Sequence, residues 1–185
     1  MSFLLAAAIV IGVIDAGPPA DVETVAMSPD PTNSDHGTKI VQAIREEVPD
    51  ARILFADPFE GDMIMDWQVM MRAMIEFKRQ GVTHVCTAFT GEDIENASVV
   101  AQFADKIGVT IVASMGNDDR QTPRLATMPN VVGVIHSEYR YRYHNAAWAD
   151  AIDYTVSGKI KGGSQGASFA SAKVCANLNK TSQQG

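Results

Sequence analysis

Cysteine is scarce in this sequence. Cys86 and Cys175 are the only two cysteines in 185 residues, and they lack the C-x-x-C spacing of metal-binding or redox pairs. Each follows a valine in apolar surroundings. We therefore expect two buried free thiols, and neither a disulfide framework nor a metal site built on cysteine.

Positive charge is also in short supply. The chain has 15 Lys and Arg residues against 22 Asp and Glu residues, which gives a formal net charge of -7. Surfaces that bind nucleic acid or anionic membranes need an excess of basic residues, and no basic run offsets the acidic balance here. We expect neither nucleic acid nor a membrane among the partners of this protein.

The N-terminal apolar run, from Phe3 to Ile14, lacks the preceding Lys or Arg that an export signal would need. The run is also too short to cross a bilayer. Its β-branched residues gather at its end, directly before Asp15, which favours a buried strand of a parallel sheet. We expect a cytoplasmic protein, or a secreted one if a leader was removed before residue 1.

Apolar, strand-like runs alternate with helical patterns along most of the chain. The predicted strands are Ala8–Ile14, Arg52–Ala56, His84–Phe89, Thr110–Ser114 and Val131–Ile135. The predicted helices between them are His36–Glu47, Met63–Gln80 and Ile94–Ile107. This alternation predicts an α/β fold with a single domain, in which a mostly parallel sheet carries helices on both faces.

The alternation weakens in the last third of the chain. We expect an edge strand or hairpin at Tyr139–Tyr143, a short strand at Asp153–Val156, a loop at 159–166 and a helix of small residues at Ser168–Asn177. No linker or internal repeat divides the chain. The sequence therefore predicts one compact domain over residues 1–180 and a disordered tail over residues 181–185.

Four polar residues lie where strands are predicted to end or helices to begin. Asp15 ends the first strand, where a carboxylate can orient a histidine. His36 opens a helix beside Gly37, and Asn117 follows a strand, where its amide can donate to an oxyanion. Ser168 begins a helix whose first N–H groups have no partner within it. Each also has an ordinary structural explanation, such as a loop cap, a turn or a helix cap.

The order Asp, His, Ser and the residues around these positions resemble the subtilisin-like serine proteases, or subtilases. The four matching segments are Val13–Gly17, His36–Thr38, Ala113–Asn117 and Gly166–Ala172. The resemblance implies that Ser168 is the nucleophile, that His36 is the general base and acid, and that Asp15 orients His36. It also implies that Asn117 is an oxyanion donor.

The same resemblance implies a substrate groove with two walls. Its candidate residues are Phe89, Thr90, Gly91, Ser114, Met115 and Gly116. The first three would pair with an extended peptide and form one wall of the S1 pocket, and the last three would form the other wall. Phe89 and Met115 favour an apolar or medium-sized residue before the scissile bond.

The chain departs from the family in ways that bear on cofactors and partners. It is shorter than most subtilase domains, and Ala172 stands where a proline usually follows the serine motif. Asp118-Asp119 is the nearest candidate for a calcium site and is a poor one, because calcium prefers six or more oxygen ligands. We expect no cofactor and no clear metal site, and a homo-oligomer or partner protein that supplies the missing surface.

These observations predict a serine endopeptidase that processes a peptide or protein substrate through an acyl-enzyme. Two alternatives remain open. If an amine intercepts the acyl-enzyme, the protein is a peptide ligase or macrocyclase that uses the same residues. If the shortened domain keeps the triad without working substrate walls, it is a catalytically weak peptide-binding module.

Overall fold

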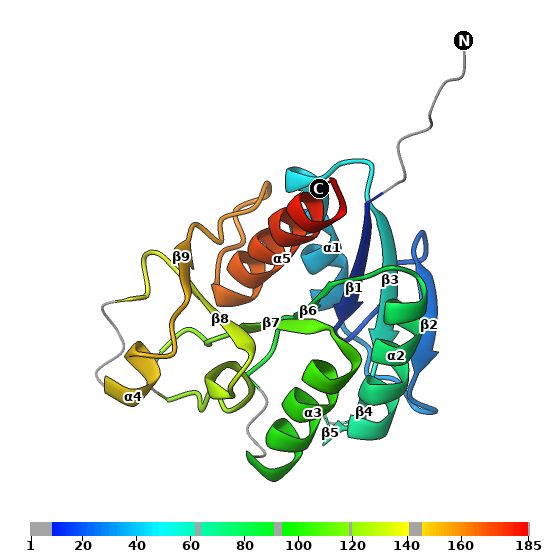
Figure 1. Ribbon diagram of the computed structural model, residues 1–185. Helices are drawn as coiled ribbons and strands as arrows, with labels where there is room; N and C mark the ends of the chain where they lie inside the picture. The colour runs from blue at the N-terminus through cyan, green and yellow to red at the C-terminus, as the bar shows by residue number, and fades with distance from the viewer. Residues whose placement is uncertain (1–8, 62–63, 91–93, 119, 141–145, 185) are drawn as a thin grey trace.

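A seven-stranded sheet forms the centre of the computed structural model, which describes residues 9–61, 64–90, 94–118, 120–140 and 146–184 (Figure 1). The strand order is β2-β3-β1-β6-β7-β8-β9, and every neighbouring pair is parallel. The strands are β1 (Val10–Ile14), β2 (Glu23–Met27), β3 (Arg52–Asp57), β6 (His84–Thr87), β7 (Thr110–Ser114), β8 (Val131–His136) and β9 (Tyr154–Val156). A separate antiparallel hairpin consists of β4 (Phe59–Glu60) and β5 (Ile64–Met65).

Helices cover both faces of this sheet. They are α1 (His36–Glu47), α2 (Trp67–Arg79), α3 (Ile94–Ile107), α4 (Ala146–Ala149) and α5 (Ala167–Gln184), with a 3₁₀ turn, η1, at Leu125–Thr127. α1 and α5 pack on one face, and α2 and α3 pack on the other (Figure 1). Successive side chains of a strand point to opposite faces, so Val13 packs with α1 and α5 while Ile14 packs with α2 and α3. The predicted α/β architecture is confirmed.

Two local predictions need correction. The helix expected from Met63 begins at Trp67, because Ile64 and Met65 form β5 and the Asp66 side chain caps the first turn. The edge strand expected at Tyr139–Tyr143 starts as a turn, in which Tyr139 N–H donates to His136 O at 2.8 Å. Residues 141–143 lie outside the described residues. No helix in the described part of the chain is long and apolar enough to span a membrane.

The expected tail from Thr181 is also corrected, because α5 continues to Gln184. The Gln183 side chain accepts from Val10 N–H at 2.9 Å and donates to Val10 O at 2.8 Å. At the preceding residue, the hydroxyls of Ser182 and Thr83 share a hydrogen bond of 2.7 Å. The last turn of α5 is therefore held against the beginnings of β1 and β6 by contacts that helical periodicity does not reveal.

Candidate active site

Asp15 and His36 meet at the carboxyl edge of the sheet, where β1 ends and α1 begins. The Asp15 side chain is buried, and its Oδ1 lies 2.8 Å from Nδ1 of His36. The same oxygen accepts Ala16 N–H at 2.7 Å. Because an ionised carboxylate only accepts hydrogen bonds, it holds the proton of a neutral His36 ring on Nδ1. Nε2 then keeps its lone pair and can act as a base.

Two opposing effects set the pKa of His36. Burial lowers the pKa, because the imidazolium loses water, while the hydrogen bond and the negative charge of Asp15 raise it. Smaller electrostatic effects come from Lys39, which lowers the pKa, and from Asp35, which raises it. The net pKa of His36 lies above the ordinary value of 6.5, so this ring is a stronger base than a free histidine side chain.

Two glycines allow the loop after β1 to approach α1 this closely. Gly37 N–H donates to Ala16 O at 2.8 Å, and a Cβ on Gly37 would lie only 2.6 Å from Gly17 O. Gly17 itself has a φ of +75°, and a Cβ there would overlap Ser34 O. Ser34 also accepts His36 N–H at 3.1 Å through its hydroxyl oxygen. A larger residue at either glycine would separate β1 from the histidine.

Ser168 lies in the first turn of α5, next to a residue that contacts the His36 ring. The ring of its neighbour Phe169 is centred 6.0 Å from the His36 ring. Ser168 Oγ donates to the backbone oxygen of Ala88 at 2.7 Å, and no hydrogen bond joins it to His36 within the described residues. The candidate nucleophile and the candidate base therefore lie on the adjacent helices α5 and α1, and the Ser168 hydroxyl points toward the end of β6.

Asn117 follows β7 and lies against the beginning of α5. Its Oδ1 accepts Ala167 N–H at 3.1 Å, and a Cβ on Gly166 would lie 3.2 Å from the same oxygen. The Nδ2 of this exposed side chain is then available as a donor. Ser168 N–H belongs to the first turn of the same helix, where backbone donors have no partner within the helix. The Asn117 side chain is thus bonded to the residue before the candidate nucleophile, whose own N–H is the second candidate donor.

The two predicted groove walls meet at Thr90 and Gly116. A Cβ on Gly116 would lie 3.1 Å from Thr90 Cγ2, and Thr90 O accepts Leu125 N–H at 3.2 Å. Half-buried Phe89 packs edge-to-face on Phe59 of β4, with ring centroids 5.2 Å apart. The hairpin of β4 and β5 therefore lies beside this wall. Gly91 lies outside the described residues.

The wall after β7 is built differently from the expectation. Ser114 is buried, and its Oγ accepts Gly116 N–H at 3.1 Å. Met115 is fully buried, so it supports this wall from the core instead of facing a groove. Gln121, which sequence reasoning missed, accepts Asn117 N–H through Oε1 and lies over Gly116. This contact joins residues four apart in the loop after β7, and no family motif includes Gln121.

Asp57 is a second residue that sequence reasoning missed. It is fully buried at the end of β3, and its two oxygens accept Gly17 N–H at 2.9 Å and Phe59 N–H at 3.0 Å. Burial raises the pKa of Asp57 above its ordinary value. This effect outweighs the two hydrogen bonds, which lower the pKa. Asp57 therefore fixes the loop that follows Asp15. Its position at the end of a strand next to β1 is the one signal that could have identified it.

Among the described residues, neither the candidate calcium position nor the two cysteines provides a set of metal ligands. No group of three or more His, Cys, Asp or Glu among the described residues is arranged to hold a metal ion. The Asp118 carboxylate pairs with Arg120, and Asp119 lies outside the described residues. Cys86 and Cys175 are buried free thiols, as predicted. A hydrogen bond with Cys175, together with burial, raises the pKa of Cys86.

Comparison with known proteins supports the fold. No protein-family model matches the chain, and no curated protein matches it. Among solved structures, the prenylagaramide maturation protease PagA is similar with a TM-score of 0.69 and 18% identity, covering 95% of this chain and 76% of that one. A lanthipeptide protease gives a TM-score of 0.65 and 18% identity over 92% of this chain and 72% of that one.

A cold-adapted subtilisin-like serine proteinase is also similar, with a TM-score of 0.68 and 17% identity. The alignment covers 95% of this chain and 75% of that proteinase. The chain therefore has a subtilisin-like fold, in agreement with the resemblance seen in its motifs.

Proposed function

We propose that this protein is a serine endopeptidase that processes a peptide or protein substrate. The observation that carries the proposal is the 2.8 Å contact between Asp15 and His36, at the same sheet edge as Ser168 in the first turn of α5. The fold adds support, because its structural neighbours include a maturation protease and a lanthipeptide protease. Those substrates belong to the neighbours, and peptide processing by this chain is part of the proposal.

The proposed reaction begins when Ser168 Oγ leaves Ala88 O and turns toward Nε2 of His36. His36 takes the hydroxyl proton as Oγ attacks the scissile carbonyl carbon, and Asp15 stabilises the resulting imidazolium. Asn117 Nδ2 and Ser168 N–H donate to the oxyanion.

His36 then gives its proton to the leaving amine, and an ester on Ser168 remains. Water, deprotonated by His36, hydrolyses this ester and frees the serine. No step needs a metal or a cofactor.

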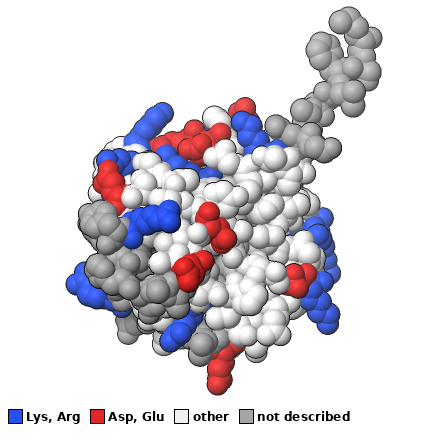
Figure 2. Space-filling model, turned by 60° about the vertical axis from the view of Figure 1, so that its left-hand side comes forward, with Lys and Arg blue, Asp and Glu red and all other residues white. Residues whose placement is uncertain are grey.

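The proposed substrate is an extended peptide that lies along Phe89, Thr90 and Gly116 and pairs with the protein backbone. On the face shown in Figure 2, Lys and Arg side chains are scattered instead of gathered into one patch. This distribution is consistent with our proposal that the partner is a peptide, and that neither nucleic acid nor an anionic membrane is bound. A cytoplasmic location is likewise part of the proposal.

Labelling with a fluorophosphonate probe tests the proposal, because the probe reacts only with an activated serine. We expect the folded wild-type protein to be labelled on Ser168, and Ser168→Ala to lose the label completely. Ser137→Ala is the control, since Ser137 is exposed in the turn after β8 and should leave labelling unchanged. Folded wild-type protein that stays unlabelled would overturn the proposal.

The hydrogen bond from Ser168 to Ala88 favours a second candidate, a peptide-binding module with little catalysis. Catalytic hydrogen bonds are often absent until substrate binds, and the proposed endopeptidase requires this contact to break on binding. Peptide binding without probe labelling would establish the second candidate. Ligation by the same residues is distinguished by mass, because a cleaved peptide gains one water and a cyclised peptide does not.

A further inference from the structure

α1 and α5 carry the two halves of the proposed catalytic machinery, and their contact is largely apolar. Ile40 and Ala43 of α1 pack in one core cluster with Phe169, Ala172 and Ala176 of α5. Apolar packing fixes how close two helices lie, but it is non-directional and specifies poorly how far one has slid along the other. The distance between His36 and Ser168 depends on the position of one helix along the other. A directional contact between the helices would fix that position.

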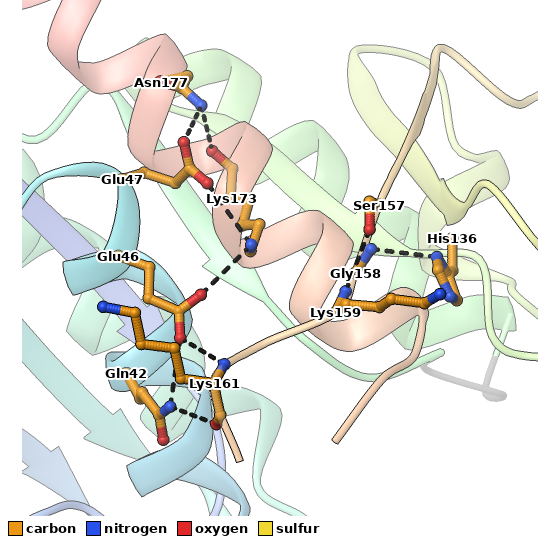
Figure 3. A network of polar contacts seen from close by, with 10 residues as sticks. All are labelled: Gln42, Glu46, Glu47, His136, Ser157, Gly158, Lys159, Lys161, Lys173 and Asn177. Atoms are coloured by element: carbon orange, nitrogen blue, oxygen red, sulfur yellow. Dashed lines mark hydrogen bonds and ion pairs between the residues drawn. The ribbon is translucent and has the colours of Figure 1, made fainter. Parts of the chain in front are cut away.

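Glu46, near the end of α1, provides such contacts with two other segments, the loop at Lys161 and α5 at Lys173 (Figure 3). Its Oε1 accepts Lys161 N–H at 2.8 Å and Gln42 Nε2 at 3.2 Å, and its Oε2 lies 3.4 Å from Nζ of Lys173 on α5. The side chains of Glu46 and Lys173 are only 15% and 16% exposed. At this degree of burial, salt and water screen the pair less than an ordinary surface ion pair.

The partners of Glu46 reinforce the same junction. Lys173 Nζ also lies 3.6 Å from the Glu47 carboxylate, and Asn177 Nδ2 donates to Glu47 at 3.3 Å (Figure 3). Gln42 Nε2 donates to Lys161 O at 2.7 Å, so both backbone groups of Lys161 are bonded to α1. Polar side chains of α1 therefore reach α5 directly and also reach the loop that leads into α5.

That loop, residues 157–166, runs directly into the first turn of α5. Gly158 N–H donates to Nδ1 of buried His136 at 3.1 Å, and Gly166 N–H donates to Gly158 O at 3.3 Å. A Cβ on Gly158 would lie 3.0 Å from Ala170 N, so the loop also packs against α5. Glu46 thus holds the loop at Lys161, and His136 holds it at Gly158, shortly before Ser168.

We propose that Glu46 is a positioning residue that sets Ser168 against His36 by fixing both α5 and the 157–166 loop to the helix that carries the histidine. The inference rests on the proposed function, because it assigns Glu46 a role in that same reaction. Asp15 anchors the beginning of α1, and Glu46 anchors its end. Glu46 touches no reacting atom and acts only through the two elements that it joins.

The test compares fluorophosphonate labelling of Glu46→Gln and Lys173→Met with that of the wild type, at a temperature where thermal melts show all proteins folded. We expect the rate constant to fall by about 10- to 100-fold in each variant, because displacements near 1 Å cost that much. The pH midpoint of labelling should not move, since Asp15 and His36 are intact. Lys173→Arg, which keeps the ion pair, should retain most of the rate.

Arg45→Met is the matched control, since Arg45 neighbours Glu46 on α1 but pairs with exposed Asp21 at 2.8 Å. It should label at the wild-type rate. The inference is overturned if folded Glu46→Gln and Lys173→Met label within twofold of the wild type, or if their rates fall only in proportion to the unfolded fraction. Failure of the wild type itself to label would instead overturn the proposed function, so the two failures are distinguishable.

Discussion

The two halves of the candidate site are assembled to different degrees. On the β1 side, Asp15 and His36 are in contact at 2.8 Å and are fixed by the close backbone approach at Gly37. On the α5 side, Ser168 is bonded to Ala88 and not to the histidine. The first half is held by a buried carboxylate at the end of β1, while the Ser168 hydroxyl of the second half is bonded to a backbone oxygen. The proposed reaction therefore requires a change in the second half, where the hydroxyl must leave Ala88.

Removing the negative charge of Asp15 should have the largest effect on the labelling rate. Asp15→Asn keeps the shape but no longer holds the proton on Nδ1 of His36, so the labelling rate should fall by about 10⁴-fold. Second-order labelling rates of folded protein measure this loss. Asp21→Asn is the control, because that exposed carboxylate pairs with Arg45 and is not among the groups that shift the pKa of His36, so the rate should change less than twofold. A modest loss in Asp15→Asn would show that the dyad is not used.

Substitutions around Ser168 should lower the reaction rate less than Asp15→Asn does. Asn117→Ala should lower the cleavage rate by about 10²- to 10³-fold, because one oxyanion donor is lost. Asn117→Asp separates the two roles of this side chain, since an aspartate keeps the oxygen that accepts Ala167 N–H and loses the donor. We expect both variants to be slow in peptide cleavage assays. An active Asn117→Asp would show that the residue is only structural.

Acidity should affect activity and stability in opposite directions. His36 must be neutral to act as a base, so labelling should fall as the pH drops through its raised pKa, above 6.5. Folding favours the protonated ring, so its contribution to stability is full below the unfolded pKa and is lost as the pH rises through the folded one. Labelling rates and thermal midpoints across this range test both trends. A midpoint below 6.5 would contradict the dyad geometry.

The smallest effect is expected for Gln183, which lies outside both halves of the candidate site. Gln183→Ala removes the two hydrogen bonds to Val10 and should lower the free energy of unfolding by about 1–2 kcal/mol. Labelling of the folded variant should match the wild type. Lys180→Ala is exposed on the same helix and should change neither quantity, as denaturant unfolding would show. An unchanged stability in Gln183→Ala would mean that these bonds contribute nothing.

The central strands could be predicted because parallel strands covered on both faces are apolar at nearly every position. β2 was missed, since Glu23, Thr24 and Met27 are exposed at the edge of the sheet and interrupt any apolar run. The end of α5 was missed for a different reason. Its last turn is held by side-chain contacts with β1 and β6, which local composition does not contain.

Within the site, the glycine-flanked motifs of Asp15 and His36 carry a strong local signal, and the structure brings these residues into contact. The orientation of the Ser168 hydroxyl, by contrast, depends on which acceptor lies nearest in three dimensions. The same holds for Asp57, which accepts the backbone N–H of Gly17 from a different segment of the chain. Sequence patterns identify side chains with suitable chemistry, but contacts that cross between elements require the fold.

The order of the site residues along the chain has a consequence for synthesis on the ribosome. Asp15 and His36 lie early, at the end of β1 and the start of α1. Ser168 lies in the last described helix, and that helix completes the face opposite α2 and α3. Domains acquire their packed core only after the segments that complete it have emerged. Under the proposed function, a nascent chain carries the proposed base long before the proposed nucleophile, so it would not cleave neighbouring nascent chains while it is being made.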